Sequence, residues 1–247
     1  MTANQFYVPR IATGVSRIVL DGDEHRHLAK AARVLAGDIV RLFDARGVRC
    51  RARVEAVEEG RTELAVLEVE EPETARTELV LAPCLIEAKK LETVLEKAAE
   101  LGCSDFMPIV SARSLKSPAE RSGRKLDRWE RIAREAVKQS KGGRRTAVHP
   151  PRPLKDFLQR PPDGLRLFLS EHGGRPLRAI VTGFGAAGRE PPASAVLLVG
   201  PKGGWTEGEE KDIRRAGFEA VTLGRRILRA ETAALAAAAM IIHFWNE

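Results

Sequence analysis

The stretch that decides the fold is residues 195–235, AVLLVGPKGGWTEGEEKDIRRAGFEAVTLGRRILRAETAAL. It contains two glycine-bearing loops, and each loop follows a short apolar run and leads into a helical pattern. The first apolar run, 195–199, is typical of a parallel strand that is covered on both faces. Ligands bind beyond the carboxyl ends of the strands in an open α/β sheet, so the two neighbouring loops predict a binding site.

The helix after the first loop carries its own start and stop signals. Thr206 and Glu209 have the spacing of a capping box, in which each side chain bonds the backbone N–H of the other residue. Gly217 marks the end of this helix. A second predicted strand, 220–223, leads into the second loop, and the next helix begins near Glu231. The segment therefore predicts two successive strand–loop–helix units.

The rest of the chain divides into two parts by its pattern. Residues 1–72 are typical of a small β-rich unit with one helix. From residue 79 onward strand patterns alternate with helix patterns, which favours an α/β fold with a parallel sheet and helices on both faces. The polar segment 71–76 is the candidate linker. We therefore expect one domain at 1–72 and a second at 73–247.

Pattern and length place further elements in both parts. In the first part we expect a helix at 27–35 and strands at 39–43, 48–57 and 63–70. In the second part we expect strands at 79–86, 106–110 and 165–170. The final helix, 233–245, is apolar nearly all round, which predicts burial in the core or against a second subunit.

The charge distribution indicates an anionic partner. The chain has 247 residues and a net charge of +7. Residues 113–145 hold twelve Lys and Arg against four Asp and Glu, whereas residues 1–72 hold eleven against twelve. The apolar positions from 126 to 137 fall on one helical stripe, and most of the cations lie off it. We expect this basic patch to contact an RNA backbone; the alternative is a solvated helix face.

Other features exclude several classes of protein. Cys50, Cys84 and Cys103 are odd in number and widely spaced, so we expect reduced thiols, with neither a disulfide framework nor a metal site. The longest apolar stretch, 233–242, is too short for a membrane span, and the first residues lack the pattern of a signal peptide. These features predict a cytoplasmic protein that binds neither membrane nor metal.

The two loops and three upstream motifs occur together in one known family. GPKGG at 200–204 and LGRRILRAETA at 223–233 are accompanied by ELG at 100–102, RS at 113–114 and EAVKQS at 135–140, in that order. Together they resemble the RsmE family of SPOUT-class methyltransferases, which modify N3 of a uridine in 16S ribosomal RNA. Two positions depart from the family, because Lys138 and Lys202 stand where it usually has acids.

The resemblance implies a particular architecture and chemistry. It implies that 73–247 is a SPOUT-type domain whose chain forms a trefoil knot, a rare exception among proteins. It implies that 1–72 is a PUA-like RNA-binding barrel. It also implies S-adenosylmethionine (SAM) as cofactor, 16S rRNA or the small ribosomal subunit as partner, and a homodimer as the working form.

The site candidates are of two kinds: cofactor-binding residues, which the resemblance implies, and RNA contacts, most of which belong to the basic patch. The candidate cofactor-binding residues are Leu169, Ser170, Glu171, Val199, Gly200, Gly203, Gly204, Leu223, Gly224, Ile227 and Leu228. The candidate RNA contacts are Arg10, Arg26, Arg113, Lys116, Arg124, Lys125, Arg128, Gln139, Arg144 and Arg145.

Two further residues are candidates for the chemistry of methyl transfer. Methylation of uracil N3 requires loss of the N3 proton and leaves transient negative charge on the ring. Arg229 is the candidate that orients the base or stabilises this charge. Glu231 is the candidate base; equally, it is an acid placed in the first turn of a helix, where the dipole favours it.

Two other functions remain open at this stage. One is a different SPOUT activity, such as ribose 2′-O methylation, and the other is a non-catalytic RNA-binding assembly factor. A dinucleotide site is not expected, although residues 183–188 match GxGxxG. Arg-Glu-Pro-Pro follows this match at 189–192, so no helix N-terminus would face a pyrophosphate.

Overall fold

The computed structural model describes residues 5–44, 46–70, 75–115, 123–140, 145–184 and 189–246. The chain forms two units, which are Met1–Thr74 with Val137–Arg145, and Ala75–Ala136 with Thr146–Glu247. The sequence predicts that all of 73–247 belongs to the second domain, whereas the structure groups Val137–Arg145 with the N-terminal residues.

The first unit is built on a five-stranded sheet in the order β1-β3-β4-β5-β2. Its strands are β1 (Gln5–Tyr7), β2 (Arg17–Asp21), β3 (Ile39–Phe43), β4 (Arg49–Glu58) and β5 (Arg61–Glu70). Neighbouring strands are antiparallel except for the parallel pair β1–β3. Cys50, Ala52 and Val54 alternate along β4 and are all buried in the core of this unit, as their spacing predicts.

The helical segment of the first unit lies earlier than expected. The predicted helix at 27–35 is corrected to α1 (Gly22–Arg26), which continues into the π-helical turn η1 (His27–Ala31). Acids in the first turn favour the early start through the helix dipole. Arg33 has a φ of +51°, a left-handed conformation that cannot continue the helix. The two turns bury only His25 and Leu28, so apolar spacing carried little information about their position.

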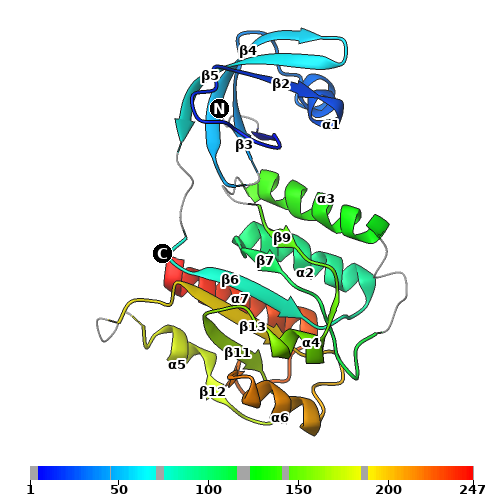
Figure 1. The fold of residues 1–247 in the computed structure, drawn as a ribbon, viewed down its shortest axis with the longest axis vertical. Helices are drawn as coiled ribbons and strands as arrows, with labels where there is room; N and C mark the ends of the chain where they lie inside the picture. The colour runs from blue at the N-terminus through cyan, green and yellow to red at the C-terminus, as the bar shows by residue number, and fades with distance from the viewer. Residues whose placement is uncertain are drawn as a thin grey trace. The chain divides into compact units, whose positions relative to one another are not determined.

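The second unit contains a seven-stranded sheet in the order β12-β14-β11-β13-β6-β7-β9 (Figure 1). All its pairs are parallel, as the alternating pattern predicts. The strands are β6 (Glu78–Pro83), β7 (Asp105–Phe106), β9 (Ala147–Val148), β11 (Leu165–Leu169), β12 (Arg175–Pro176), β13 (Ser194–Val199) and β14 (Glu219–Thr222). The helices are α2 (Ala88–Leu101), α4 (Leu154–Gln159), α5 (Leu177–Val181), α6 (Glu207–Arg215) and α7 (Ala230–Asn246), with α3 (Gly123–Ser140) crossing from the second unit into the first.

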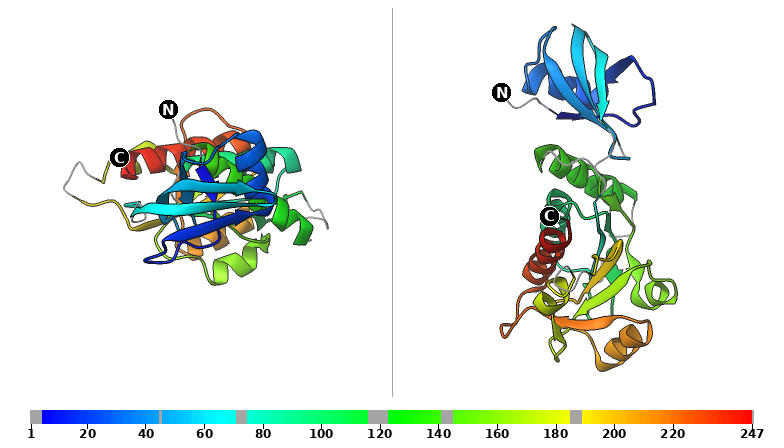
Figure 2. Two further views of the ribbon diagram at one scale, coloured as in Figure 1. Left: turned by 90° about the horizontal axis from the view of Figure 1, so that it is seen from above. Right: turned by 90° about the vertical axis from the view of Figure 1, so that its left-hand side faces the viewer.

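Helices cover both faces of this sheet. On one face Phe157 of α4 and Ile213 of α6 pack into a core with Phe168, Val196 and Leu198. On the other face α7 contacts β6 and β13 and packs against α2 and α5 (Figure 2). Because both faces are covered, β13 is buried along nearly its whole length, and its sequence is a continuous apolar run rather than an alternating one. The prediction of a mixed α/β fold with a parallel sheet and helices is confirmed.

One predicted strand is wrong as a single element. Residues 106–110 contribute to two short strands, β7 and β8 (Ile109–Val110). β7 pairs with β6 and β9, whereas β8 pairs with β10 (Arg152–Pro153). Pro108 lies between them and has no N–H to donate, so the ladder cannot run through it.

Candidate active site

A pocket of about 970 Å³ opens at the carboxyl ends of the parallel strands in the second unit. Its walls are formed by the segments that follow β6, β11, β13 and β14, together with part of residues 113–115. Ligands are expected at this edge of an open parallel sheet. The volume is also in the range of sites that enclose small molecules.

The structure brings together residues that the sequence scatters over three segments. The candidate cofactor-binding residues that line this one pocket are Leu169, Ser170, Glu171, Val199, Gly200, Gly203, Gly204, Leu223, Gly224, Ile227 and Leu228. Arg229, Glu231 and Arg113 line it as well. The predicted residues therefore share one site, and their individual roles remain predictions.

The first glycine loop, residues 200–206, is held by several bonds of its own. The indole N–H of Trp205 donates to the Leu169 carbonyl at 3.0 Å, which joins the loop to the end of β11. The N–H of Gly204 donates to the Pro201 carbonyl at 2.9 Å. Thr206 and Glu209 form the predicted capping box at the start of α6. The loop is therefore fixed at its middle and at its helical end.

Residues 111–115 bind the same loop from outside it. The Nη1 of Arg113 donates to the Gly203 carbonyl at 2.6 Å and to the Trp205 carbonyl at 3.4 Å. The N–H of Ala112 donates to Oε1 of Glu209 at 2.7 Å. The sequence predicts an RNA contact for Arg113 and contains no signal for this pairing with the loop.

A polar cluster that the sequence did not indicate lies beside the end of β11. Oε1 of Glu210 accepts a hydrogen bond from Oγ of Ser170 at 3.1 Å and lies 3.0 Å from Nδ1 of His172. The hydrogen bond with Glu210 raises the pKa of His172, and the negative charge of Glu210 adds to the effect. Both residues line the pocket. The only sequence signal for Glu210 is its membership of an acid-rich first turn in α6.

The second glycine loop, residues 224–229, is much more exposed. Ile227 is 79% exposed although it is a large apolar residue. Within the described parts of the chain, the side chains of Arg225, Arg226 and Arg229 make no hydrogen bond or ion pair. The Arg229 carbonyl accepts the N–H of Ala233 at 2.8 Å, which starts α7.

The candidate base lies in the first turn of α7 and has a cationic neighbour. Oε1 of Glu231 is 3.4 Å from Nζ of Lys90, and the Glu231 side chain is 22% exposed. Lys90 also lies 3.8 Å from Glu87 at the start of α2. The carboxylate of Glu231 is therefore oriented at the pocket wall by an ion pair.

The other candidate RNA contacts lie outside the pocket. Arg10, Arg124 and Gln139 are exposed, and Arg26 pairs with Asp23. Arg128 donates from Nε and Nη2 to the two carboxylate oxygens of Glu92, each at 2.8 Å.

Two more cations of this set lie over aromatic rings, Lys125 5.3 Å from the Trp129 centroid and Arg145 6.0 Å from that of Tyr7. Lys116 and Arg144 lie outside the described residues. Lys138, one of the two departures from the family pattern, pairs with Glu24 in the first unit.

The described residues contain neither a metal-binding cluster nor a membrane-spanning helix. No group of three or more His, Cys, Asp or Glu is placed to hold a metal ion in the part of the chain that the structure covers. None of the described helices is both long enough and apolar enough to cross a membrane.

Comparison with known proteins shows which family this chain is similar to. Residues 73–242 match the model of a family described as an RNA methyltransferase domain. Ribosomal RNA small subunit methyltransferase E of Synechocystis sp. is 31% identical over 228 residues, 91% of this chain and 72% of the relative. The protein of the same name from Bacillus subtilis is 28% identical over 90% of this chain and 88% of its own.

A solved structure extends the similarity to the whole fold. The crystal structure of a ribosomal RNA small subunit methyltransferase E from Neisseria gonorrhoeae, bound to S-adenosyl methionine, matches with a TM-score of 0.86 at 31% identity. The match covers 99% of this chain and 98% of the other.

A parallel sheet with a pocket at its carboxyl edge, in a chain matched by that family model, defines an RNA methyltransferase. Within this class, the chain belongs to the family of ribosomal RNA small subunit methyltransferase E. The family resemblance of the two glycine loops and their companion motifs is therefore confirmed.

Proposed function

We propose that this protein transfers a methyl group from SAM to N3 of a uridine in 16S rRNA of the small ribosomal subunit. The observation that carries the proposal is a pocket in which three loop segments converge, in a chain of this family. The relative from N. gonorrhoeae was crystallised with SAM, and the curated relatives are named as methyltransferases of small-subunit rRNA.

The residues of the pocket fit SAM. SAM supplies an electrophilic methyl group on a sulfonium centre, and its adenine and amino-acid groups need close contact with backbone donors and acceptors rather than a phosphate cradle. The first loop supplies such contact because its glycines leave main-chain groups uncovered. A Cβ on Gly203 would lie 3.3 Å from Cδ of Arg113, and one on Gly200 would lie 3.1 Å from Nε1 of Trp205. The loop therefore leaves little room for larger side chains at these positions.

Arg229 and Glu231 are the residues proposed to act on the base. Loss of the N3 proton places negative charge on the uracil ring, and a guanidinium at the pocket wall stabilises such charge. Arg229 has its side chain exposed at the pocket. The carboxylate of Glu231, oriented by Lys90, is the candidate proton acceptor, with water as the alternative.

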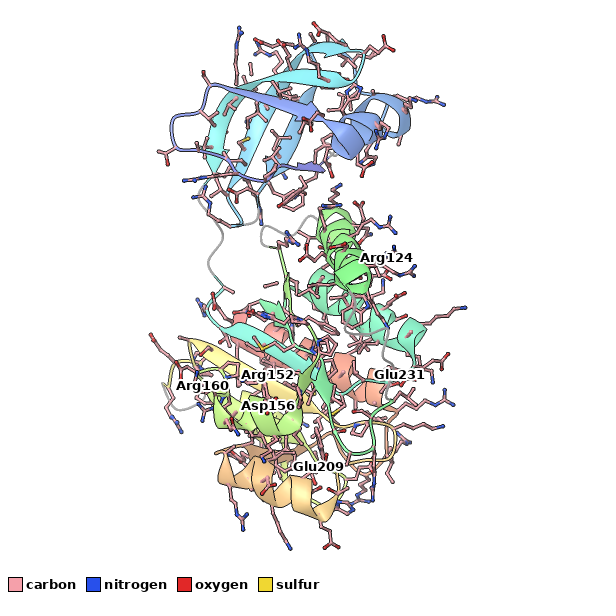
Figure 3. The ribbon with its side chains drawn as sticks, turned by 45° about the vertical axis from the view of Figure 1, so that its right-hand side comes forward. Arg124, Arg152, Asp156, Arg160, Glu209 and Glu231 are labelled. Carbon is pink, nitrogen blue, oxygen red and sulfur yellow. The ribbon has the colours of Figure 1, made fainter. Side chains whose placement is uncertain are left out.

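The charge of the pocket wall suits an RNA substrate. Besides Arg113, whose guanidinium bonds the main chain of the first loop, five cations line it (Lys90, Lys202, Arg225, Arg226 and Arg229) against four acids (Glu87, Glu171, Glu210 and Glu231). A surplus of cations favours binding of phosphates that flank the target base. Lys202, the second departure from the family pattern, adds to this surplus. We assign further RNA contacts to the first unit, as a PUA-like barrel, and to the exposed cations of α3, such as Arg124 (Figure 3).

A knotted chain and a homodimer belong to the same proposal. The support for a trefoil knot in 73–247 is the family to which the chain belongs. For the dimer, the support is α7, where Phe244 is 48% exposed and Ile242 is only partly buried. An apolar surface of this kind on a terminal helix favours a second copy of the chain as its cover. Sedimentation should then give about twice the chain mass of 27.1 kDa.

The direct test is methylation of unmodified RNA. Purified protein is incubated with methyl-labelled SAM and either small subunits or bare 16S rRNA from cells that lack the modification, and the nucleosides are separated by mass. We expect 3-methyluridine. A 2′-O-methylated nucleoside would replace the proposal with the other SPOUT activity, and RNA binding without SAM binding would indicate an assembly factor.

The RNA contacts are tested through Arg124. Arg124→Glu should weaken RNA binding and make its salt dependence less steep, because each lost phosphate contact lowers the slope by roughly one. SAM affinity, measured by calorimetry, should stay the same. An unchanged salt slope would show that Arg124 on the exposed face of α3 is only solvated and contacts no phosphate.

A further inference from the structure

Residues 111–115 form a short strap that is fixed by hydrogen bonds other than those to the first glycine loop. Oγ of Ser114 accepts the N–H of Ser111 at 2.9 Å, and the two hydroxyls lie 2.8 Å apart. The N–H of Leu115 donates to the Leu85 carbonyl at 3.1 Å, at the end of β6. Both serines are buried. The strap is therefore a firm support, anchored in the sheet, for whatever it binds.

The strap binds the first glycine loop and the first turn of α6 through two hydrogen bonds, both of which it donates. The side chain of Arg113 donates to the main chain of Gly203, and the main chain of Ala112 donates to the side chain of Glu209. The Glu209 carboxylate serves both partners, because Oε1 takes the Ala112 N–H while Oε2 accepts from the N–H and hydroxyl of Thr206. The loop and the first turn of α6 are thus tied to the strap at two points.

Such a tie matters because the loop is costly to order. Three glycines in residues 200–204 give the free loop many conformations, and fixing each residue opposes binding entropically. A loop that is already fixed before a ligand arrives requires less ordering on binding. Among the bonds that hold the loop, the one from Arg113 acts on the carbonyl between its two adjacent glycines, Gly203 and Gly204.

We propose that Arg113 and Glu209 are positioning residues, which clamp the first glycine loop to the strap and so preorganise the pocket for its cofactor. The assignment rests on the proposed function in one respect, that the cofactor is SAM. It differs from the sequence-based role of Arg113, because the guanidinium acts on the protein's own main chain. Arg113 itself need not touch SAM for its loss to weaken SAM binding.

The first experiment replaces Arg113 and measures three properties on each protein. Arg113→Ala should raise the Kd and KM for SAM roughly tenfold, the scale of one charge-assisted hydrogen bond. The kcat at saturating SAM, the Kd for RNA and the Tm should change little. Arg113→Lys should restore part of the SAM affinity, because an ammonium can still donate to the Gly203 carbonyl but lacks the fork.

Arg152→Ala is the matched control. Nη2 of Arg152 also donates to a main-chain carbonyl, that of Asp156, at 2.7 Å, and the residue is exposed and absent from the pocket wall (Figure 3). Its loss should leave SAM binding unchanged. If Arg113→Ala binds SAM as tightly as Arg152→Ala does, or loses RNA affinity instead, the clamp is wrong. If wild-type protein fails to bind SAM, the proposed function is wrong instead.

A second variant tests whether the two bonds act as one device. In Glu209→Gln the single amide oxygen can keep the capping box, and the amide nitrogen then faces the Ala112 N–H, donor against donor. SAM affinity should fall several-fold while α6 stays capped. Because both bonds fix the same loop, Arg113→Ala combined with Glu209→Gln should weaken SAM binding by less than the product of the single effects. If the combined loss of SAM affinity equals the product of the single losses, the two contacts are independent and the shared clamp is wrong.

Limited proteolysis measures how often the first glycine loop opens in the absence of a ligand. Lys202 is exposed in the first loop, so trypsin can cut after it when the loop opens. In Arg113→Ala this cut should be several-fold faster than in Arg152→Ala, as followed by fragment masses. Equal rates in the two variants would show that Arg113 does not hold the loop.

Discussion

The two glycine loops of the pocket look alike in sequence but differ in how they are held. The first, residues 200–206, is bonded through Trp205, through the Thr206–Glu209 capping box and through Arg113. The second, residues 224–229, has an apolar side chain that is 79% exposed and three arginines without a hydrogen bond or ion pair in the described residues.

The difference separates two tasks within one pocket. A loop that is fully bonded within the protein is suited to hold a cofactor in one geometry, because little ordering remains to be done on binding. A loop with unpaired cations and an uncovered apolar residue is suited to a partner that arrives later and covers it, such as RNA or a second copy of the chain. We therefore expect side-chain variants of the first loop to affect SAM affinity, and variants of the arginines in the second loop to affect RNA binding and the chemical step.

The largest effect is expected in the second loop, at Arg229. Arg229→Ala should lower kcat for methyl transfer roughly 10²–10³-fold, the scale seen when one electrostatic stabiliser of a transition state is removed. SAM affinity and Tm should change little, because the residue has no bond within the described protein to lose. Arg229→Lys should recover only part of the rate. Single-turnover kinetics with saturating SAM measures this loss.

Arg226→Ala is the matched control for Arg229, since Arg226 is exposed on the same loop and lines the same pocket. It should weaken RNA binding but spare the rate at saturating RNA. An equal loss of kcat in both variants would show that the loop contributes only bulk positive charge. A loss of SAM binding and of Tm in Arg229→Ala would show that the Arg229 side chain packs the loop rather than acts on the base.

The next effect is expected in the first loop, at Trp205. This residue is 3% exposed, and Trp205→Phe leaves the Leu169 carbonyl without its indole donor. This hydrogen bond is only partly buried, so its loss should lower the free energy of unfolding by about 1 kcal/mol. SAM affinity should fall with it, because the tie between the loop and β11 is lost. Denaturant titration and calorimetry measure the two effects.

Trp245→Phe is the control that separates a loss of overall stability from a loss of SAM affinity. The Trp245 indole also donates to a main-chain carbonyl, that of Val181, at 3.2 Å, and the residue is 1% exposed. It does not line the pocket. We expect a similar loss of stability with normal SAM affinity. Equal loss of SAM affinity in both variants would mean that the pocket responds to global stability rather than to the frame of the first loop.

Much of this site could be predicted because its signals are local. The capping box depends on residues three apart, and the apolar run of β13 and the glycines after it lie within ten residues. Such signals survive in a single sequence because the interacting groups are neighbours along the chain. The pocket brings the predicted residues together because parallel strands present their carboxyl ends at one edge.

The ties between distant segments could not be predicted in this way. Arg113 and Gly203 are 90 positions apart, and His172 and Glu210 are 38 apart. Each looks like an ordinary surface residue until the fold places its partner. The same limit applies to net charge: composition counts Arg128 as a free cation of the basic patch, whereas the structure pairs it with Glu92.

Glycine substitutions compare the two loops directly. Gly204 has a φ of +67°, and a Cβ there would lie 3.5 Å from Oε2 of Glu171. Gly204→Ala should lower the free energy of unfolding by about 1 kcal/mol, because an L-residue is strained in this conformation and the bonded loop cannot relax. Gly224 has a φ of +110°, which is formally worse for alanine, although an added Cβ would meet nothing within 4 Å.

The second loop should nevertheless tolerate its alanine better. Few bonds hold residues 224–229, so the backbone at Gly224 can shift to a permitted conformation, and Gly224→Ala should lower the free energy of unfolding by less than Gly204→Ala. Denaturant melts of both variants under one condition give the comparison. A larger loss for Gly224→Ala would mean that the second loop is held as firmly as the first, and the contrast between the loops would be lost.

The smallest effect concerns His172, beside the first loop. Its hydrogen bond with Glu210 raises its pKa in the folded protein. The bond therefore stabilises the protein fully below the ordinary pKa of histidine, and this contribution is lost as the pH rises through the raised value. Because the imidazole is exposed, the change should be small.

Replacing Glu210 tests this pH dependence. Glu210→Gln should return the pKa of His172 toward its ordinary value, as followed by NMR titration of the ring proton. The difference in Tm between wild type and Glu210→Gln should be larger at pH about 6 than at pH about 8.5, since only the protonated ring gains from the carboxylate. His172→Gln removes the titrating ring but keeps Glu210. In a protein that carries His172→Gln, the change in Tm caused by Glu210→Gln should therefore be the same at both pH values. A difference between wild type and Glu210→Gln that is equal at both pH values would show that Glu210 stabilises the protein through Ser170 rather than through His172.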